Sequence, residues 1–199
     1  MHAPVPTDPA DPPIPADLRV LLLPGWRDSG PTHWQTRWEA LHGDERVVQA
    51  DWEWPLRGDW MARLDEVVAD DPRPVALVAH SLGCQLVAAW AAHTRQAARV
   101  RGALLVAPPD VERDDMPPQL HGWRPIVRTA LPFPALAVTS SDDPFGAPPR
   151  VQAMVRDWGA AQVDAGPRGH LNGESGLGDW PEGRRWLARV VGTRRPAAA

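Results

Sequence analysis

Residues Pro74 to Trp90 read P-V-A-L-V-A-H-S-L-G-C-Q-L-V-A-A-W, and the rest of the chain is best understood from them. The first part, Val75 to Ala79, is a short apolar run bounded by prolines, which is typical of a strand covered on both faces of a parallel sheet. After A-H-S-L-G, apolar side chains recur with helical spacing among alanines, which predicts a helix with one buried stripe. Ser81 is therefore predicted to lie on a turn between a buried strand and a helix.

A serine on such a turn is well placed for nucleophilic catalysis. Its hydroxyl stands clear of the backbone, and the N–H groups that begin the following helix can stabilise an oxyanion. The usual pattern is G-x-S-x-G, from which Ala79 departs by one methyl group while Gly83 agrees with it. The five residues alone fit an ordinary strand-to-helix turn that contains a serine equally well, so the rest of the chain must discriminate between the two interpretations.

Length, composition and charge exclude several classes of protein. A chain of 199 residues, 43% of them hydrophobic, is long enough for one domain with a sizeable core. The formal net charge is −4 and no basic run precedes the scattered arginines near the C-terminus, so a nucleic-acid partner is not expected. The single cysteine, Cys84, excludes an internal disulfide and is expected to be a small buried side chain.

Both ends of the chain have the composition of flexible tails. Residues 1–17 are rich in Pro and Asp and have no apolar core, unlike a signal or transit peptide, and residues 193–199 end in R-R-P-A-A-A. No apolar run approaches the length that spans a membrane. We therefore expect a soluble cytoplasmic protein with one folded domain, residues 18–192, between two tails.

Strands and helices are predicted to alternate along the folded part. Helical spacing of apolar residues follows most of the predicted strands. Three helices have capping signals, at Thr32, Asp59 and Asp179, and Leu41 belongs to the buried stripe predicted for the first helix. The apolar runs that predict strands are residues 18–23, 46–50, 75–79, 102–107, 135–140 and 161–165.

This alternation predicts the α/β class, with a mainly parallel six-stranded sheet, helices on both faces and no large cap domain. Ligands of such sheets bind beyond the carboxyl ends of the strands. Polar or turn residues follow four of the predicted strands at that end. They are Gly25-Trp26, Ser81, Asp142-Asp143 and Gly169-His170.

These four positions supply the parts of an acyl-transfer site in the chain order nucleophile, acid, base. That order is expected of α/β-hydrolases and differs from the order in other serine hydrolase folds. Ser81 is the expected nucleophile, His170 the general base, and Asp143 the carboxylate that orients the imidazole. The backbone N–H groups of Leu82 and of Trp26, which follows a tight P-G turn, are expected to form the oxyanion hole.

Asp143 is preferred to its neighbour Asp142 for a geometric reason. Adjacent side chains of an extended segment point in opposite directions, so only one of the two can face His170. Pro144 favours an extended conformation at Asp143. Asp142 is then expected to be a solvated carboxylate or a support for the loop.

The other histidines have structural interpretations. The side chain of His80 is expected to diverge from Ser81 and to make a structural hydrogen bond, and His33 is expected to help hold the first loop near the site. No pair of histidines has the spacing of metal ligands, and no glycine-rich phosphate loop is present. The sequence therefore implies neither a metal nor a cofactor.

Four segments resemble those of a known family: P-G-W…G-P-T-H-W, A-H-S-L-G-C, S-D-D-P-F, and the most specific, G-H-L-N-G-E-S-G-L-G-D-W-P-E-G. Over about residues 18–190 the chain resembles the small bacterial serine hydrolases related to retinoblastoma-binding protein 9, which are YdeN-like. The resemblance implies a compact α/β-hydrolase fold with a triad at Ser81, Asp143 and His170. It implies no particular metabolite. The L-x-C-x-E motif associated with binding to the retinoblastoma pocket is missing, so no such partner is inferred.

The expected activity is cleavage of a small ester, thioester or amide. Large caps are usually inserted after the strand that follows the nucleophile helix, and here that connection, Pro108 to Pro134, is polar and Pro-rich and has room for one short helix. A short acyl or amino-acyl group is therefore expected. Trp26 and Trp123 are expected to form an apolar wall, and the acidic residues of the connection to disfavour anionic substrates.

Two other interpretations remain at this point. One is a non-catalytic α/β-hydrolase-like module that binds a small ligand or a protein, against which the complete set of triad residues argues. The other is a nucleotide-binding doubly wound domain, which the missing G-x-G-x-x-G after the first strand disfavours. The sequence does not determine the natural substrate or the oligomeric state.

Overall fold

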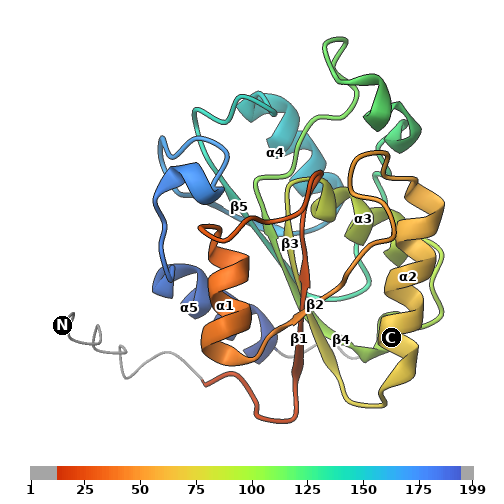
Figure 1. Cartoon of the computed structure of the whole chain (residues 1–199), viewed down its shortest axis with the longest axis vertical. Coiled ribbons are helices and arrows are strands. Elements are labelled where there is room, and N and C mark those ends of the chain that lie inside the picture. Colours follow the sequence, from red (N-terminus) through yellow and green to blue (C-terminus); the bar gives the residue numbers. More distant parts are fainter. Residues whose placement is uncertain (1–12, 194–199) are drawn as a thin grey trace.

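One parallel sheet forms the centre of the molecule, as the computed structural model of residues 13–193 shows (Figure 1). Its strand order is β2-β1-β3-β4-β5-β6, and every neighbouring pair is parallel. The predicted α/β class and six-stranded sheet are thus confirmed, while residues 1–12 and 194–199 of the predicted tails lie outside the described residues. The strands are β1 (Arg19–Leu23), β2 (Glu45–Arg46), β3 (Val75–His80), β4 (Val100–Val106), β5 (Ala135–Thr139) and β6 (Ala161–Asp164).

Helices cover both faces of the sheet. On one face lie α1 (Trp34–His42) and α5 (Pro181–Gly192), and on the other lie α2 (Arg57–Asp70), α3 (Leu82–Ala91) and α4 (Pro148–Asp157) (Figure 1). Successive side chains of a strand point to opposite faces, so Leu22 packs with the first pair of helices and Leu21 with the other three. Both faces are therefore buried, as the continuous apolar run of β3 predicts.

The strands that follow β1 in the sequence lie on both sides of it in the sheet. The strand β2 pairs with one edge of β1, and β3 pairs with the other edge before β4, β5 and β6 are added. In open α/β sheets, ligands bind at the carboxyl ends of strands where the order reverses in this way. The loop after Leu23 and the turn at Ser81 both start at this point, because Leu23 lies opposite Ala79 in the ladder.

The second strand is shorter than predicted. The sequence predicts residues 46–50, but β2 contains only Glu45 and Arg46, and the last bond to β1 runs from the N–H of Val47 to the carbonyl of Leu22. The reason lies in the partner strand, because Pro24 follows Leu23 and has no N–H group with which to continue the ladder.

The helix starts also differ from the capping predictions. His33, not Thr32, caps α1, and its Nδ1 accepts a hydrogen bond from the N–H of Gln35. Asp59 lies inside the first turn of α2, where a carboxylate still interacts favourably with the helix dipole. Asp179 binds Arg37 instead of capping α5, and the predicted core residue Leu41 is 55% exposed.

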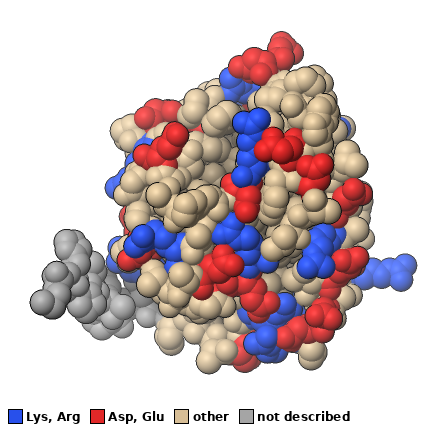
Figure 2. Space-filling model, in the orientation of Figure 1, with Lys and Arg blue, Asp and Glu red and all other residues tan. Residues whose placement is uncertain are grey.

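The described surface mixes charges of both signs. On the face shown in Figure 2, arginine and carboxylate side chains are interspersed. Among the described residues, no helix has the length and apolar character needed to cross a membrane.

Two helical glycines provide a test of this packing. A Cβ atom at Gly83 would lie 2.2 Å from the carbonyl oxygen of Leu23, whereas a Cβ at Gly58 in α2 would meet nothing within 4 Å. We expect Gly83→Ala to lower the free energy of unfolding by about 2 kcal/mol or more, because backbone must move. The matched control Gly58→Ala should raise it by about 0.5–1 kcal/mol. Urea unfolding measures both, and equal effects would contradict the close approach.

Candidate active site

Ser81 lies where the sequence places it, on the turn between β3 and α3. Its φ of 53° and ψ of −122° are in a sparsely populated region, so the predicted turn is strained at this residue. The N–H of Ser81 donates to the carbonyl of Val106 in β4 at 2.9 Å, which fixes the turn to the sheet. Ala79 is fully buried in the core, so its methyl group is accommodated where the usual pattern has glycine.

The loop after β1 packs directly against the serine. A Cβ atom at Gly25 would lie 2.8 Å from Cβ and 3.2 Å from Oγ of Ser81, so only glycine allows this approach. The next residue, Trp26, lines the same cavity as Ser81 and Leu82. Leu82 is the first residue of α3, so its N–H has no acceptor within the helix. Both predicted oxyanion-hole residues therefore lie beside the serine.

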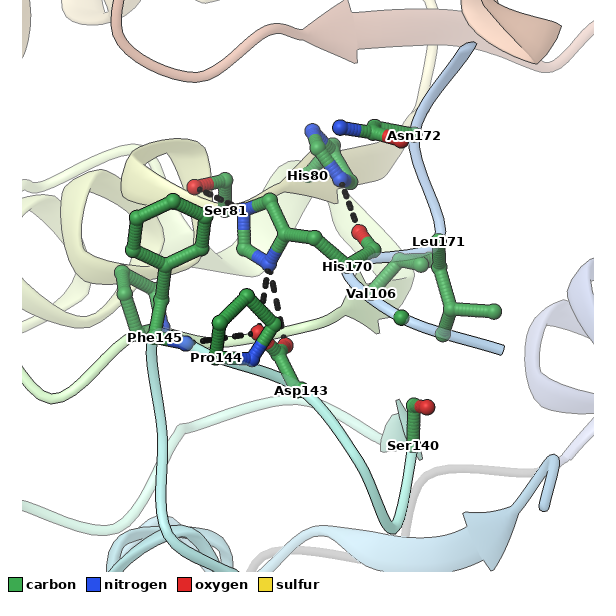
Figure 3. A network of polar contacts seen from close by, with 12 residues as sticks. His80, Ser81, Val106, Ser140, Asp143, Pro144, Phe145, His170, Leu171 and Asn172 are labelled. Atoms are coloured by element: carbon green, nitrogen blue, oxygen red, sulfur yellow. Dashed lines mark hydrogen bonds and ion pairs between the residues drawn. The ribbon is translucent and has the colours of Figure 1, made fainter. Parts of the chain in front are cut away.

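His170 and Asp143 complete a continuous chain of hydrogen bonds from Ser81 (Figure 3). Nε2 of His170 lies 2.8 Å from Oγ of Ser81, and its Nδ1 lies 2.9 Å from each carboxylate oxygen of Asp143. Both side chains are shielded from water, since the imidazole is 9% exposed and the carboxylate 4%. The N–H of Phe145 also donates to Asp143 at 2.9 Å and holds the carboxylate in place.

The hydrogen-bond partners of His170 define its tautomer. An ionised carboxylate only accepts hydrogen bonds, so Nδ1 of His170 carries the hydrogen when it binds Asp143. Nε2 is then unprotonated and accepts the hydroxyl hydrogen of Ser81. This is the arrangement in which an imidazole can remove a proton from a serine hydroxyl.

Asp142 supports the loop and does not reach the imidazole ring. Its carboxylate accepts hydrogen bonds from the hydroxyl of Ser140 at 2.8 Å and from the N–H of Gly169 at 2.7 Å. These bonds lower the pKa of Asp142 from its usual value. Of the two neighbouring aspartates, Asp143 is the one whose carboxylate contacts the imidazole of His170.

Two further histidines lie in a row with His170. The ring centroids of His33 and His80 are 4.6 Å apart, and those of His80 and His170 are 4.9 Å apart. Burial lowers the pKa of His33 to about 4 and holds the pKa of His80 well below its ordinary value. His80 makes the expected structural hydrogen bond, with Nε2 lying 2.9 Å from the carbonyl oxygen of His170.

A cavity of about 380 Å³ opens beside Ser81. The predicted wall residue Trp26 lines it, but Trp123 does not, because its indole is buried in the core and donates to the carbonyl of Pro55. The connection from Pro108 to Pro134 contributes a short 3₁₀ helix, Pro118–Trp123, as the sequence predicts. Apolar residues that line the cavity include Trp26, Leu82, Met116, Pro117, Leu120 and Phe145.

Arginine side chains offset much of the negative charge of the connection from Pro108 to Pro134. Its carboxylates Asp110 and Glu112 form ion pairs with Arg150 of α4, and Asp115 pairs with Arg113. The carboxylates that line the cavity come from other segments, namely Asp28, which pairs with Arg46, and Glu174. No arginine lines the cavity among the described residues.

Several cavity residues were missed by the sequence analysis. The ring of Phe145 lies 4.5 Å from that of His170, and Asn172 and Glu174 follow His170 along the cavity wall. A signal for Phe145 was available, because in an extended segment it projects to the same side as Asp143. Asn172 and Glu174 lie in the stretch that carries the family resemblance, but its spacing does not show which side chains face the cavity, because the stretch forms only one short 3₁₀ helix, Gly173–Ser175.

The described residues contain no cluster of three His, Cys, Asp or Glu side chains suited to a metal ion. Cys84 is buried, and burial raises the pKa of its thiol, so it is an inert core residue as expected.

Comparison with known proteins finds a serine hydrolase family and hydrolase structures. A family model described as serine hydrolase matches residues 20–189. A YdeN-like hydrolase from Pectobacterium atrosepticum is 29% identical, with a TM-score of 0.76 over 87% of this chain and 90% of that one. The predicted resemblance to YdeN-like hydrolases is thereby confirmed, whereas the relation to retinoblastoma-binding protein 9 stays a prediction.

Two more distant structures share the fold. The ydeN gene product of B. subtilis is 18% identical, with a TM-score of 0.67 over 88% of this chain and 99% of that one. The type II thioesterase BorB from the borrelidin biosynthetic cluster is 20% identical, with a TM-score of 0.54 over 81% of this chain and 87% of that one. No curated protein matches the chain.

The buried His33 makes stability depend on pH. An unfolded histidine takes up a proton below its pKa of about 6.5, whereas folded His33 resists protonation down to about 4, so stability falls as the pH decreases through this window. His33→Asn keeps an acceptor for the helix cap but does not titrate. When the pH is lowered from about 7 to about 5, the free energy of unfolding should fall in both proteins. We expect the fall to be smaller in the variant than in the wild type by about 2 kcal/mol. Equal losses in urea unfolding would contradict a buried, neutral His33.

Proposed function

Because the chain belongs to the serine hydrolase family, we propose that it cleaves a small ester, thioester or amide through an acyl-enzyme at Ser81. The observation that carries the proposal is the unbroken hydrogen-bonded chain Ser81–His170–Asp143 at the start of α3. No cofactor is part of the proposal.

In the acylation step, Oγ of Ser81 attacks the carbonyl carbon of the substrate while Nε2 of His170 takes the hydroxyl proton. Asp143 stabilises the imidazolium that forms, because its carboxylate lies 2.9 Å from Nδ1. The N–H groups of Leu82 and Trp26 stabilise the negative oxygen of the tetrahedral intermediate. His170 then gives its proton to the leaving group, and the bond between that group and the carbonyl carbon breaks.

In the deacylation step, a water molecule replaces the leaving group. His170 removes a proton from this water, the resulting hydroxide attacks the acyl-enzyme, and the proton returns to Oγ of Ser81 as the acid leaves. The same two N–H groups stabilise the second tetrahedral intermediate.

The dimensions and lining of the cavity favour a small, uncharged or cationic acyl group. A volume of about 380 Å³ is at the lower end of the range for ligand pockets. Its apolar side chains suit a short hydrocarbon group, and the carboxylate of Glu174 disfavours an anionic one. The cytoplasmic location and the absence of nucleic-acid and membrane partners stay predictions from the sequence.

Labelling with a fluorophosphonate probe tests the proposal directly. The wild-type protein should be labelled, and Ser81→Ala should abolish labelling with nearly unchanged thermal stability, since alanine loses only a small hydroxyl group. The matched control Ser141→Ala, at an exposed serine beyond β5, should label like the wild type. A wild-type protein that is folded but not labelled would instead favour the non-catalytic binding module.

The two neighbouring aspartates should differ sharply in their effect on turnover. Asp143→Asn removes the carboxylate that fixes the tautomer of His170, so we expect kcat to fall by about 10³-fold or more. Asp142→Asn keeps an oxygen that accepts from Gly169, so its kcat should stay within about tenfold of the wild type. Steady-state hydrolysis of p-nitrophenyl acetate measures both. A larger fall in kcat for Asp142→Asn than for Asp143→Asn would instead make Asp142 the carboxylate that orients His170.

A series of p-nitrophenyl esters tests the size of the acyl site. We expect kcat/KM to be highest for acyl chains of about two to four carbons, because the cavity is small and the connection forms only a short wall. A maximum at about twelve carbons or more would show that longer chains are accommodated.

A further inference from the structure

The loop that carries His170 lacks regular secondary structure at that residue, and side chains hold it in place. The residues on either side of His170 both have positive φ, 59° at Gly169 and 49° at Leu171. Each residue from Arg168 to Asn172 has a backbone N–H or C=O group that binds a side chain. In loop order, those side chains are Ser140, Asp142, His80, Trp34 and Ser175.

The bond to His170 itself comes from His80, the last residue of β3 (Figure 3). A carbonyl oxygen only accepts hydrogen bonds, so Nε2 of His80 carries the hydrogen in this contact of 2.9 Å. The imidazole is 5% exposed, and its burial, together with the adjacent His170 and His33, favours the neutral form. A buried neutral ring with a fixed tautomer is a well-defined donor.

The strand β3 therefore contacts both partners of the Ser81–His170 pair. Ser81 directly follows the last residue of the strand, and that last residue, His80, binds the backbone of His170. Every residue of β3 is buried, and the strand pairs with β1 on one edge and β4 on the other. The strand is therefore a rigid support for the groups at its end. The loop of His170, by contrast, bends at Gly169 and relies on side-chain bonds.

Resting on the proposed function, we propose that His80 is a positioning residue for the hydrolysis. Its Nε2–H holds the carbonyl group of His170 and thereby keeps the imidazole of His170 within hydrogen-bond distance of Oγ of Ser81. Loss of this bond lets the loop relax and moves the base away from the nucleophile. A displacement of about 1 Å at a reacting group is enough to lower a rate by up to about 10²-fold.

The alternative is that His80 only fills space between the sheet and the loop. Phenylalanine and glutamine discriminate between the two roles, because phenylalanine keeps a ring without a donor, whereas glutamine keeps an N–H at a similar distance from the backbone. A positioning role needs the donor, and a packing role needs the ring.

Kinetics of His80→Phe and His80→Gln with p-nitrophenyl acetate test the proposal. H80F should lower kcat by about 10- to 100-fold with KM within about twofold, and H80Q should restore kcat to within about fivefold of the wild type. His93→Phe is a control, because His93 is exposed and follows the C-terminal end of α3, whereas Ser81 precedes the first residue of that helix. Its kcat should stay within about twofold of the wild type.

A double-mutant cycle with His170→Ala shows through which residue His80 acts. If His80 acts through His170, adding H80F to H170A should lower the residual hydrolysis by less than about threefold. Three results would each overturn the positioning role. They are a normal kcat in H80F, a kcat of H80Q as low as that of H80F, and a fall in the rate of H170A, on adding H80F, as large as the fall that H80F causes in the wild type. Should H80F fail to fold, His80→Leu replaces it. If H170A itself leaves hydrolysis unchanged, the proposed function fails, and this result is distinct from a failure at His80.

Discussion

The backbone at the start of α3 runs against the end of β1 with no room for a side chain between them. A Cβ atom at Gly83 would nearly touch the carbonyl oxygen of Leu23, and one at Gly25 would collide with Ser81. This close approach brings the turn at Ser81, the first N–H groups of α3 and the loop after β1 into one small volume at the point where the strand order reverses. The strained φ of Ser81 is maintained because β3, β4 and α3 hold the chain on both sides.

The nucleophile and the base are supported in different ways. Main-chain bonds of regular elements fix Ser81, including its own N–H to the carbonyl of Val106. His170 lies in an irregular loop that side chains hold from three other segments, among them Trp34, whose indole donates to the carbonyl of Leu171 at 2.9 Å. The geometry of the pair thus depends on polar side chains as much as on the sheet, and this is why His80, at the end of the central strand, matters to both partners.

The parts of the site that follow from parallel-sheet topology were predictable from the sequence. Ser81, Asp143 and His170 each follow a strand, and the carboxyl ends of parallel strands share one edge of the sheet, so these side chains meet. Features set by contacts distant in sequence were not predictable. The length of β2 depends on Pro24 of its partner strand, and Trp123 lies in the core because its indole binds Pro55. The acidic connection is neutralised by arginines such as Arg150, and no local pattern signals that pairing.

The central claim is that an acyl group passes through Ser81. The most direct measurement is rapid acid quenching of the protein during turnover of p-nitrophenyl acetate, followed by mass spectrometry of the intact chain and of its peptides. The account predicts an increase of one acetyl group that maps to the peptide containing Ser81 and disappears as the substrate is exhausted. Hydrolysis without any covalent adduct, or an adduct on another residue that turns over at the same rate, would contradict it.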